Sequence, residues 1–194
     1  MKRICVFAGS SMGVHPEFAA AAEKLGAELA ARKLELVYGG SNKGLMGRVA
    51  DTVLKAGGKA IGVMPTGLIR SERVHTELTE FYEVKTMHER KAKMGELADG
   101  FIALPGGYGT FEELFEAVCW GQIGIHDKPI GLLNVNGYYE PLIALVRHAI
   151  EAGFIPAKQD ELLLLESDPA RLLDRMESYT PLKRVKKWCE VEMP

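Results

Sequence analysis

The chain has 194 residues, of which 47% are hydrophobic and 26% charged, and its formal net charge is −2. This is the composition of a globular protein and excludes a disordered, collagen-like or coiled-coil chain. A near-neutral charge without a long basic run argues against a nucleic-acid-binding surface, and the apolar runs are too short for a transmembrane helix. Because Cys5, Cys119 and Cys189 form no CxxC pair, we expect a reduced, cytoplasmic protein without disulfides or a cysteine zinc site.

Short apolar strands alternate with amphipathic helices along the whole chain. In chain order, we predict a strand at 4–7, a helix at 16–32, a strand at 34–38, a helix at 45–56, a strand at 60–64, an irregular stretch at 65–80, a strand at 81–84, a helix at 87–98, a strand at 101–104, a helix at 110–122, a strand at 130–133, a helix at 139–152, a strand at 162–165 and a helix at 169–179. This alternation predicts one α/β domain over residues 1–180, a Rossmann-like parallel sheet with helices on both faces, and a solvated tail at 181–194.

Three glycine-rich loops follow predicted strands, at residues 9–13 (GSSMG), 39–47 (GGSNKGLMG) and 105–110 (PGGYGT). In a parallel sheet all three lie at the carboxyl edge, where open α/β sheets bind ligands. Glycine lets the backbone approach an anion closely, and the next helix points its first N–H groups at that anion. Gly44 is followed by Leu45 and Met46 rather than Lys-Ser/Thr, and no GxGxxG occurs. A mononucleotide or sugar phosphate therefore fits better than ATP or NAD.

The predicted helix at 87–98 carries two cations in its apolar stripe. At 100° per residue, Arg90 and Lys91 share a face with Met87, Met94 and Ala98. Either their heads reach water while their stems are buried, or they meet a phosphate or carboxylate.

The predicted helix at 110–122 has an acid just after the glycine loop. The helical repeat assigns its core face to the apolar side chains Phe111, Leu114, Phe115 and Val118. Glu113, Ala117 and Trp120 then lie on the opposite side, and Glu112 points elsewhere. Glu113 is either a helix-start carboxylate or a group that reaches the ribose of a bound nucleotide.

We expect neither metal nor serine-nucleophile chemistry. The five histidines show no ligand spacing, and His88 does not begin an HExxH motif because residue 92 is alanine. We expect no serine nucleophile either, although GSSMG at 9–13 has the GxSxG spacing. We therefore expect no metal site.

Four motifs in register resemble those of the Lonely Guy (LOG) family of cytokinin riboside 5′-monophosphate phosphoribohydrolases. They are PGGYGTFEE at 105–113, which matches PGGxGTxxE, MHERKA at 87–92, LVYGG at 36–40 with GLMG at 44–47, and ICVF at 4–7 with GSS at 9–11. The sequence departs from many members at Ser41, where they have a third glycine, and from plant members at Thr86, where they often have an acid. Both positions are expected near the pocket and bear on the preferred base.

The resemblance implies a cofactor-free homodimer that cleaves the N-glycosidic bond of a purine nucleoside 5′-monophosphate, with adenine or N6-modified adenine as base. It gives Arg90 and Glu113 the catalytic positions, with Arg90 either anchoring the nucleotide or assisting departure of the base. The expected substrate-binding residues are Gly9, Ser10, Gly40, Ser41, Gly44, Met87, Arg90, Lys91, Gly106, Gly107, Tyr108, Gly109, Thr110 and Glu113.

Two other functions keep part of this pattern. A non-catalytic nucleotide or molybdopterin carrier would keep the glycine loops without needing Arg90 and Glu113 together. A pyridoxal-phosphate decarboxylase would need a pocket lysine, for which Lys91 and Lys43 are the candidates. For the dimer we expect an interface on the helices at 87–98 and 110–122 that covers Trp120.

Overall fold

Seven parallel strands form one sheet in the computed structural model, which describes residues 1–69, 73–157 and 159–182. The strand order is β4-β3-β2-β1-β5-β6-β7. Strands covered on both faces read as continuous apolar runs, as the central strands of this chain do. The strands are β1 (Arg3–Phe7), β2 (Glu35–Tyr38), β3 (Ala60–Pro65), β4 (Glu80–Val84), β5 (Gly100–Ala103), β6 (Ile130–Leu133) and β7 (Leu163–Glu166).

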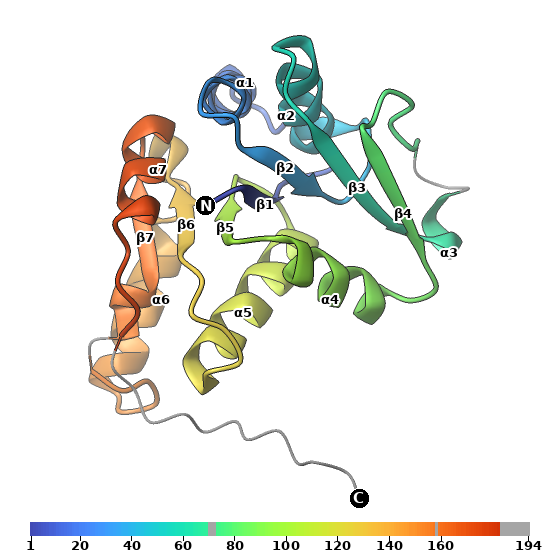
Figure 1. Cartoon of the computed structure of the whole chain (residues 1–194). Helices are drawn as coiled ribbons and strands as arrows, with labels where there is room; N and C mark the ends of the chain where they lie inside the picture. Colours follow the sequence, from blue (N-terminus) through green and yellow to red (C-terminus); the bar gives the residue numbers. More distant parts are fainter. Residues whose placement is uncertain (70–72, 158, 183–194) are drawn as a thin grey trace, which may run out of the picture.

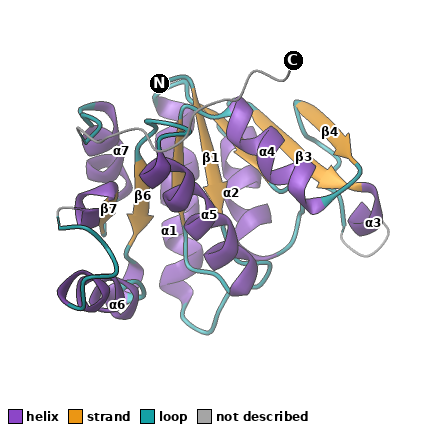
Figure 2. Ribbon diagram, turned by 90° about the horizontal axis from the view of Figure 1, so that it is seen from below, coloured by secondary structure: helices purple, strands orange, loops and turns teal. Residues whose placement is uncertain are grey.

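Helices cover both faces of the sheet (Figure 1). Alternate residues of β1 belong to two separate cores: Ile4 and Val6 pack beneath α1, α2 and α7, whereas Cys5 and Phe7 pack beneath α4, α5 and α6. Figure 2 shows α4 and α5 in front of the central strands. The helices are α1 (Pro16–Ala31), α2 (Gly44–Lys55), α3 (Thr66–Ile69), α4 (Met87–Leu97), α5 (Tyr108–Ile123), α6 (Glu140–Glu151) and α7 (Pro169–Glu177), with 3-10 turns at Val135–Gly137 and Gln159–Leu162.

The alternation read from the sequence is confirmed, with element ends that agree to within two residues. The stretch at 65–80 is more ordered than predicted. It contains α3 and an antiparallel bridge between Ser41 and Val74, which local pattern does not reveal because the bridge joins distant parts of the chain. Residues 183–194 of the expected tail lie outside the described part.

The buried side of α5 differs from the prediction. Glu113 and Ala117 are buried along with Leu114, whereas Phe115 is exposed. The reason is that α5 lies over the sheet beside α4, so that the side with Glu113 and Ala117 faces Phe7 of β1. The expectation that Glu113 faces away from the core is therefore wrong.

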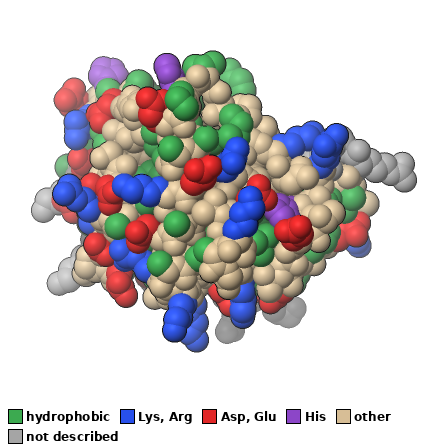
Figure 3. Space-filling view, turned by 90° about the horizontal axis from the view of Figure 1, so that it is seen from above, with side chains coloured by type: hydrophobic (Ala, Val, Ile, Leu, Met, Phe, Trp, Pro, Cys, Tyr) green, Lys and Arg blue, Asp and Glu red, His purple; other side chains and the backbone are tan. Residues whose placement is uncertain are grey.

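The molecular surface carries charges of both signs, interspersed over the face seen in Figure 3. Among the helices that the structure describes, none is both long and apolar enough to cross a membrane.

Candidate active site

A cavity of about 210 Å³ opens at the carboxyl edge of the sheet, between the loops that follow β1 and β5. The strand order reverses between these two strands, which is where open α/β sheets bind ligands. The Gly9 N–H donates to the Pro105 carbonyl at 3.1 Å and holds the two loops together. The cavity is lined by Ala8, Gly9, Ser10, Met46, Arg90, Gly107, Tyr108, Gly109, Thr110 and Glu113.

One end of the cavity is the first turn of α5. This helix has 16 residues and starts at Tyr108, after Gly107, which provides no side-chain cap. The N–H groups of a first turn have no helical carbonyl to bind, and the helix dipole adds positive potential there. At Gly106 an added Cβ would lie 2.1 Å from Thr110 Oγ1, so the close packing of this turn requires glycine. The turn is suited to binding a phosphate group.

Arg90 of α4 also lines the cavity, next to Glu113. The side chain is buried, its Nε donates to the Val63 carbonyl at 3.2 Å, and its Nη2 lies 3.5 Å from Glu113 Oε1. Of the two interpretations of the cation in the apolar stripe, the one in which Arg90 meets a carboxylate is confirmed.

Glu113 sits one turn into α5, and 8% of its surface is exposed. Burial raises the pKa of Glu113 to about 7, because the charged form loses its hydration there. The Arg90 and Lys91 charges oppose this rise in pKa, and Glu112 and Glu116 add to it. Above about pH 7 the site therefore holds a poorly hydrated carboxylate beside a guanidinium, which suits it to stabilise a nearby positive charge.

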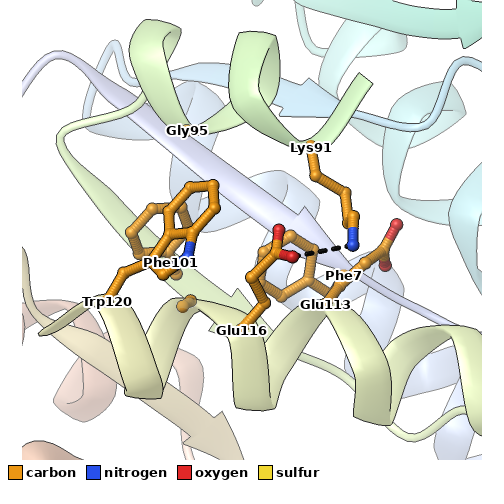
Figure 4. A pocket seen from close by; sticks show the side chains of 8 residues that line it. Phe7, Lys91, Gly95, Phe101, Glu113, Glu116 and Trp120 are labelled. Carbon is orange, nitrogen blue, oxygen red and sulfur yellow. Dashed lines mark hydrogen bonds and ion pairs between the residues drawn. The ribbon is translucent and has the colours of Figure 1, made fainter. Parts of the chain in front are cut away.

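Lys91 is turned away from this cavity. Its amino group is buried between α4 and α5, where it is paired with Glu112 and lies 2.8 Å from Glu116 (Figure 4). Burial lowers the pKa of Lys91, but the hydrogen bonds to the two carboxylates outweigh this effect and raise it. In the described chain, Lys91 thus joins two helices and does not line the cavity that holds Glu113 and Arg90.

A second, smaller recess separates α4 from α5 and contains Trp120. Figure 4 shows the Trp120 ring beside Phe101, with Glu113 near Phe7. Trp120 is only partly exposed and lies against Gly95 of the same chain. The expected outward position of Trp120 is therefore wrong: α4 of the same chain covers it.

Five further residues expected to bind substrate lie next to the cavity instead of lining it, and one of them is Gly106, which packs against Thr110. Ser41 is fully buried, and its Oγ accepts from the Lys43 N–H at 3.3 Å. An added Cβ at Gly44 would lie 2.3 Å from the Ser10 backbone, so Gly44 packs under the first glycine loop. Gly40 packs against Gly62 and Val63 of β3, and Met87 Sδ lies 3.9 Å from Arg90 Nη1.

The two departures from the resembled family have local structural roles. Ser41 holds its own turn, as described above, and Thr86 caps α4 by accepting from the Glu89 N–H at 3.1 Å. Neither residue lines the cavity.

Gly39 is a site residue that the sequence analysis missed. A Cβ at this position would lie 2.0 Å from Arg90 Nη2, so the guanidinium fits only against a glycine. The signal was present as the Gly39-Gly40 doublet, but the sequence could not show which side chain approaches it. Met46 and Ala8, which line the cavity, were missed as well.

The change Gly39→Ala tests this contact. The added methyl group displaces the Arg90 guanidinium, and we expect kcat to fall roughly tenfold, because small misplacements of a reacting group are costly. Gly67→Ala is a matched control, since no atom lies within 4 Å of the added Cβ there. Steady-state kinetics of the two variants would decide, and equal kcat values would rule out a role for the Gly39 contact.

Across residues 1–69, 73–157 and 159–182, no group of three His, Cys, Asp or Glu side chains is arranged to hold a metal ion.

A family model and several known proteins match most of this chain. A family model described as "Possible lysine decarboxylase" matches residues 46–176. A "Probable cytokinin riboside 5′-monophosphate phosphoribohydrolase" of Oryza sativa subsp. japonica is 50% identical over 181 residues, which cover 93% of this chain and 80% of the relative. A cytokinin riboside 5′-monophosphate phosphoribohydrolase of Arabidopsis thaliana is 46% identical over 181 residues, covering 93% and 79%.

Solved structures share the fold at lower identity. The molybdenum cofactor binding protein from Rippkaea orientalis matches with a TM-score of 0.67 and 22% identity over 92% of this chain and 97% of that one. The molybdenum cofactor carrier protein from Chlamydomonas reinhardtii matches with a TM-score of 0.69 and 19% identity over 91% and 96%. At these identities the likeness shows the fold alone.

Proposed function

The chain belongs to the LOG family of cytokinin riboside 5′-monophosphate phosphoribohydrolases, and on this premise we propose that it hydrolyses the N-glycosidic bond of purine nucleoside 5′-monophosphates. The base is adenine or an N6-modified adenine, and the products are the free base and ribose 5-phosphate. The observation that carries the proposal is the Arg90–Glu113 pair in the wall of the cavity, one helical turn from the first turn of α5.

The geometry supports a simple division of roles. The first turn of α5 binds the 5′-phosphate, which places the ribose next to Glu113. As the C1′–N9 bond breaks, its electron pair leaves with the base and positive charge develops on the ribose, which the Glu113 carboxylate stabilises. Water adds to C1′ and loses a proton, the base gains one, and Arg90 holds the nucleotide against Glu113.

The two competing functions fit the described residues less well. A carrier needs no buried carboxylate beside the phosphate-binding turn, and the carrier proteins among the solved structures are similar in fold only. A decarboxylase needs a free pocket lysine, whereas the Lys91 amino group is held by two carboxylates outside the cavity.

A panel of nucleoside 5′-monophosphates tests the proposal. Catalytic amounts of protein are incubated with AMP, its N6-prenylated form and the pyrimidine counterparts, and free base is separated by chromatography. We expect many turnovers with at least one purine nucleotide. Binding of a purine nucleotide without base release would support the carrier alternative instead.

Activity should depend on pH through Glu113. Because burial raises the pKa of this group to about 7, the carboxylate needed for catalysis is lost as the pH falls through about 7. We therefore expect kcat/KM to rise with pH on an acid limb centred near 7 and to level off above it. An acid limb near 4.5, or activity that increases toward acid pH, would contradict the proposed ionised role of Glu113.

We further propose that residues 1–180 form the catalytic domain of a cytoplasmic homodimer whose interface uses α4 and α5. Three large apolar side chains on these two helices are exposed: Met87, Tyr108 and Phe115. An exposed apolar group beside a ligand cavity is typical of an interface. We therefore expect Phe115, and not Trp120, to lie in the dimer interface.

Light scattering tests the dimer. We expect twice the chain mass of 21.3 kDa at micromolar concentration, and we expect Phe115→Asp to lower the mass to that of one chain, because a charge at the interface is not solvated. Leu145→Asp, on the exposed face of α6, is the matched control and should remain dimeric. A monomeric parent protein would refute the assembly.

A further inference from the structure

A short segment outside the cavity pairs with the second glycine loop. The Asn42 N–H donates to the Arg73 carbonyl at 3.0 Å, and the His75 N–H donates to the Gly40 carbonyl at 2.9 Å. Together these two bonds form the antiparallel bridge of Ser41 with Val74. Gly40 has a φ of +78°, a left-handed backbone that favours glycine. These backbone hydrogen bonds therefore hold the second glycine loop in place at Gly40.

The side chain of His75 fixes this segment to α2. His75 is 5% exposed, and its Nδ1 accepts from the Glu77 N–H at 3.2 Å. In a neutral imidazole this leaves the proton on Nε2, which donates to Asp51 Oδ1 at 2.9 Å. A buried imidazole with both nitrogens bonded is rigid, so it sets the distance between the segment and the helix.

The helix to which His75 is hydrogen-bonded, α2, also holds the first glycine loop. The N–H groups of Leu45 and Met46, in the first turn of α2, both donate to the Gly9 carbonyl, at 3.0 and 3.3 Å. Gly9 in turn bonds to Pro105 at the start of the third loop. The three loops thus form one stack, with the His75 segment at its outer end.

Arg90 contacts the second glycine loop of this stack at Gly39. Gly39, which directly precedes Gly40, packs against the Arg90 guanidinium so closely that no Cβ fits between them. A shift of Gly40 moves Gly39, and a shift of Gly39 changes the position of Arg90 relative to Glu113. His75 therefore acts on Arg90 through two adjacent backbone residues.

We propose that His75 is a positioning residue: its bond to Asp51 holds Gly40 and Gly39 in place and so keeps the Arg90 guanidinium next to Glu113. The inference rests on the proposed hydrolysis of nucleoside monophosphates and adds a residue to it. His75 does not line the cavity, so it touches no reacting atom.

Two substitutions of His75 separate its two bonds. In His75→Gln the amide nitrogen takes the place of Nε2 and keeps the donor to Asp51, whereas in His75→Asn the amide oxygen takes the place of Nδ1 and keeps only the bond to Glu77. We expect His75→Asn to lower kcat for AMP about tenfold, and His75→Gln to retain most of kcat. His148→Asn, on the exposed side of α6, is the control for the chemical change.

Asp51 provides a second test if His75→Asn fails to fold. This side chain is 43% exposed, so replacing it leaves no buried cavity. Asp51→Ala should reproduce the loss of kcat, and Asp51→Asn, which keeps an acceptor for Nε2–H, should not.

The pH profile distinguishes positioning from general destabilisation. The Arg90 charge lowers the pKa of Glu113, and the other charged groups acting on that carboxylate, Lys91, Glu112 and Glu116, lie on α4 and α5, away from the His75 segment. If Arg90 moves away, the acid limb of the kcat profile shifts upward in His75→Asn and Asp51→Ala, and stays in place in His75→Gln, Asp51→Asn and His148→Asn.

Loss of activity with an unmoved acid limb, or full activity in His75→Asn and Asp51→Ala, would overturn the positioning role. Absence of base release by the parent protein would instead overturn the proposed function, and the positioning role with it.

Discussion

Replacing Glu113 with glutamine should lower kcat by on the order of 10²-fold or more, while AMP still binds. The amide keeps the size of the side chain and much of its hydrogen bonding, but it removes the charge that would stabilise the cation developing on the ribose. The effect is large because Glu113 is buried, so that little water screens its charge. Steady-state kinetics give kcat, and calorimetry with AMP shows whether binding survives.

Glu112→Gln is the matched control for this change. Glu112 is the preceding acid on α5, half exposed and paired with Lys91 outside the cavity. We expect its kcat to stay within a few-fold of the parent value, since surface ion pairs contribute little. If Glu113→Gln turned over AMP at the parent rate, the assignment of the catalytic carboxylate would be wrong.

Removing the 5′-phosphate from the substrate is the other change with a large expected effect. Adenosine should show a kcat/KM on the order of 10³-fold below that of AMP, because binding energy from the non-reacting phosphate is used at the reacting bond. The structural basis is the first turn of α5, where Tyr108, Gly109 and Thr110 line the cavity. Comparable kcat/KM values for the two substrates would contradict the phosphate site.

Product inhibition provides an independent readout of the same site. Ribose 5-phosphate should compete with AMP, whereas ribose at the same concentration should not. Competition by both sugars alike would locate the binding energy in the ribose and not in the phosphate.

The fold could be predicted from the sequence because its signals are local. Glycine loops and apolar runs mark the ends of β1, β2 and β5 within two residues. The burial of Arg90 could also be predicted, since a cation at a helical spacing shared with Met94 falls on the covered side of α4.

Which side of α5 is buried could not be predicted from the sequence in the same way. Helical periodicity assumes that the most apolar side is the covered one, and in α5 that stripe ends in Phe115, which is exposed. The covered side carries Glu113 because α4 and β1 enclose it, and that packing depends on tertiary contacts.

Gly39 and His75 were beyond the sequence for a related reason. Gly39 contacts Arg90, and His75 contacts Gly40 and Asp51. In each of these pairs the two residues are at least 24 positions apart in the sequence. A lone histidine gives no local sign of such a bond, and a glycine doublet does not show which member meets a side chain.

The fate of AMP in water enriched in oxygen-18, with the protein present in catalytic amount, tests most directly whether this protein hydrolyses the N-glycosidic bond. Hydrolysis at C1′ releases one adenine and one ribose 5-phosphate per nucleotide, and mass spectrometry should find the heavy oxygen on the sugar, retained when the C1 position is trapped by immediate reduction. Release of adenosine and inorganic phosphate, or recovery of intact AMP, would contradict the account.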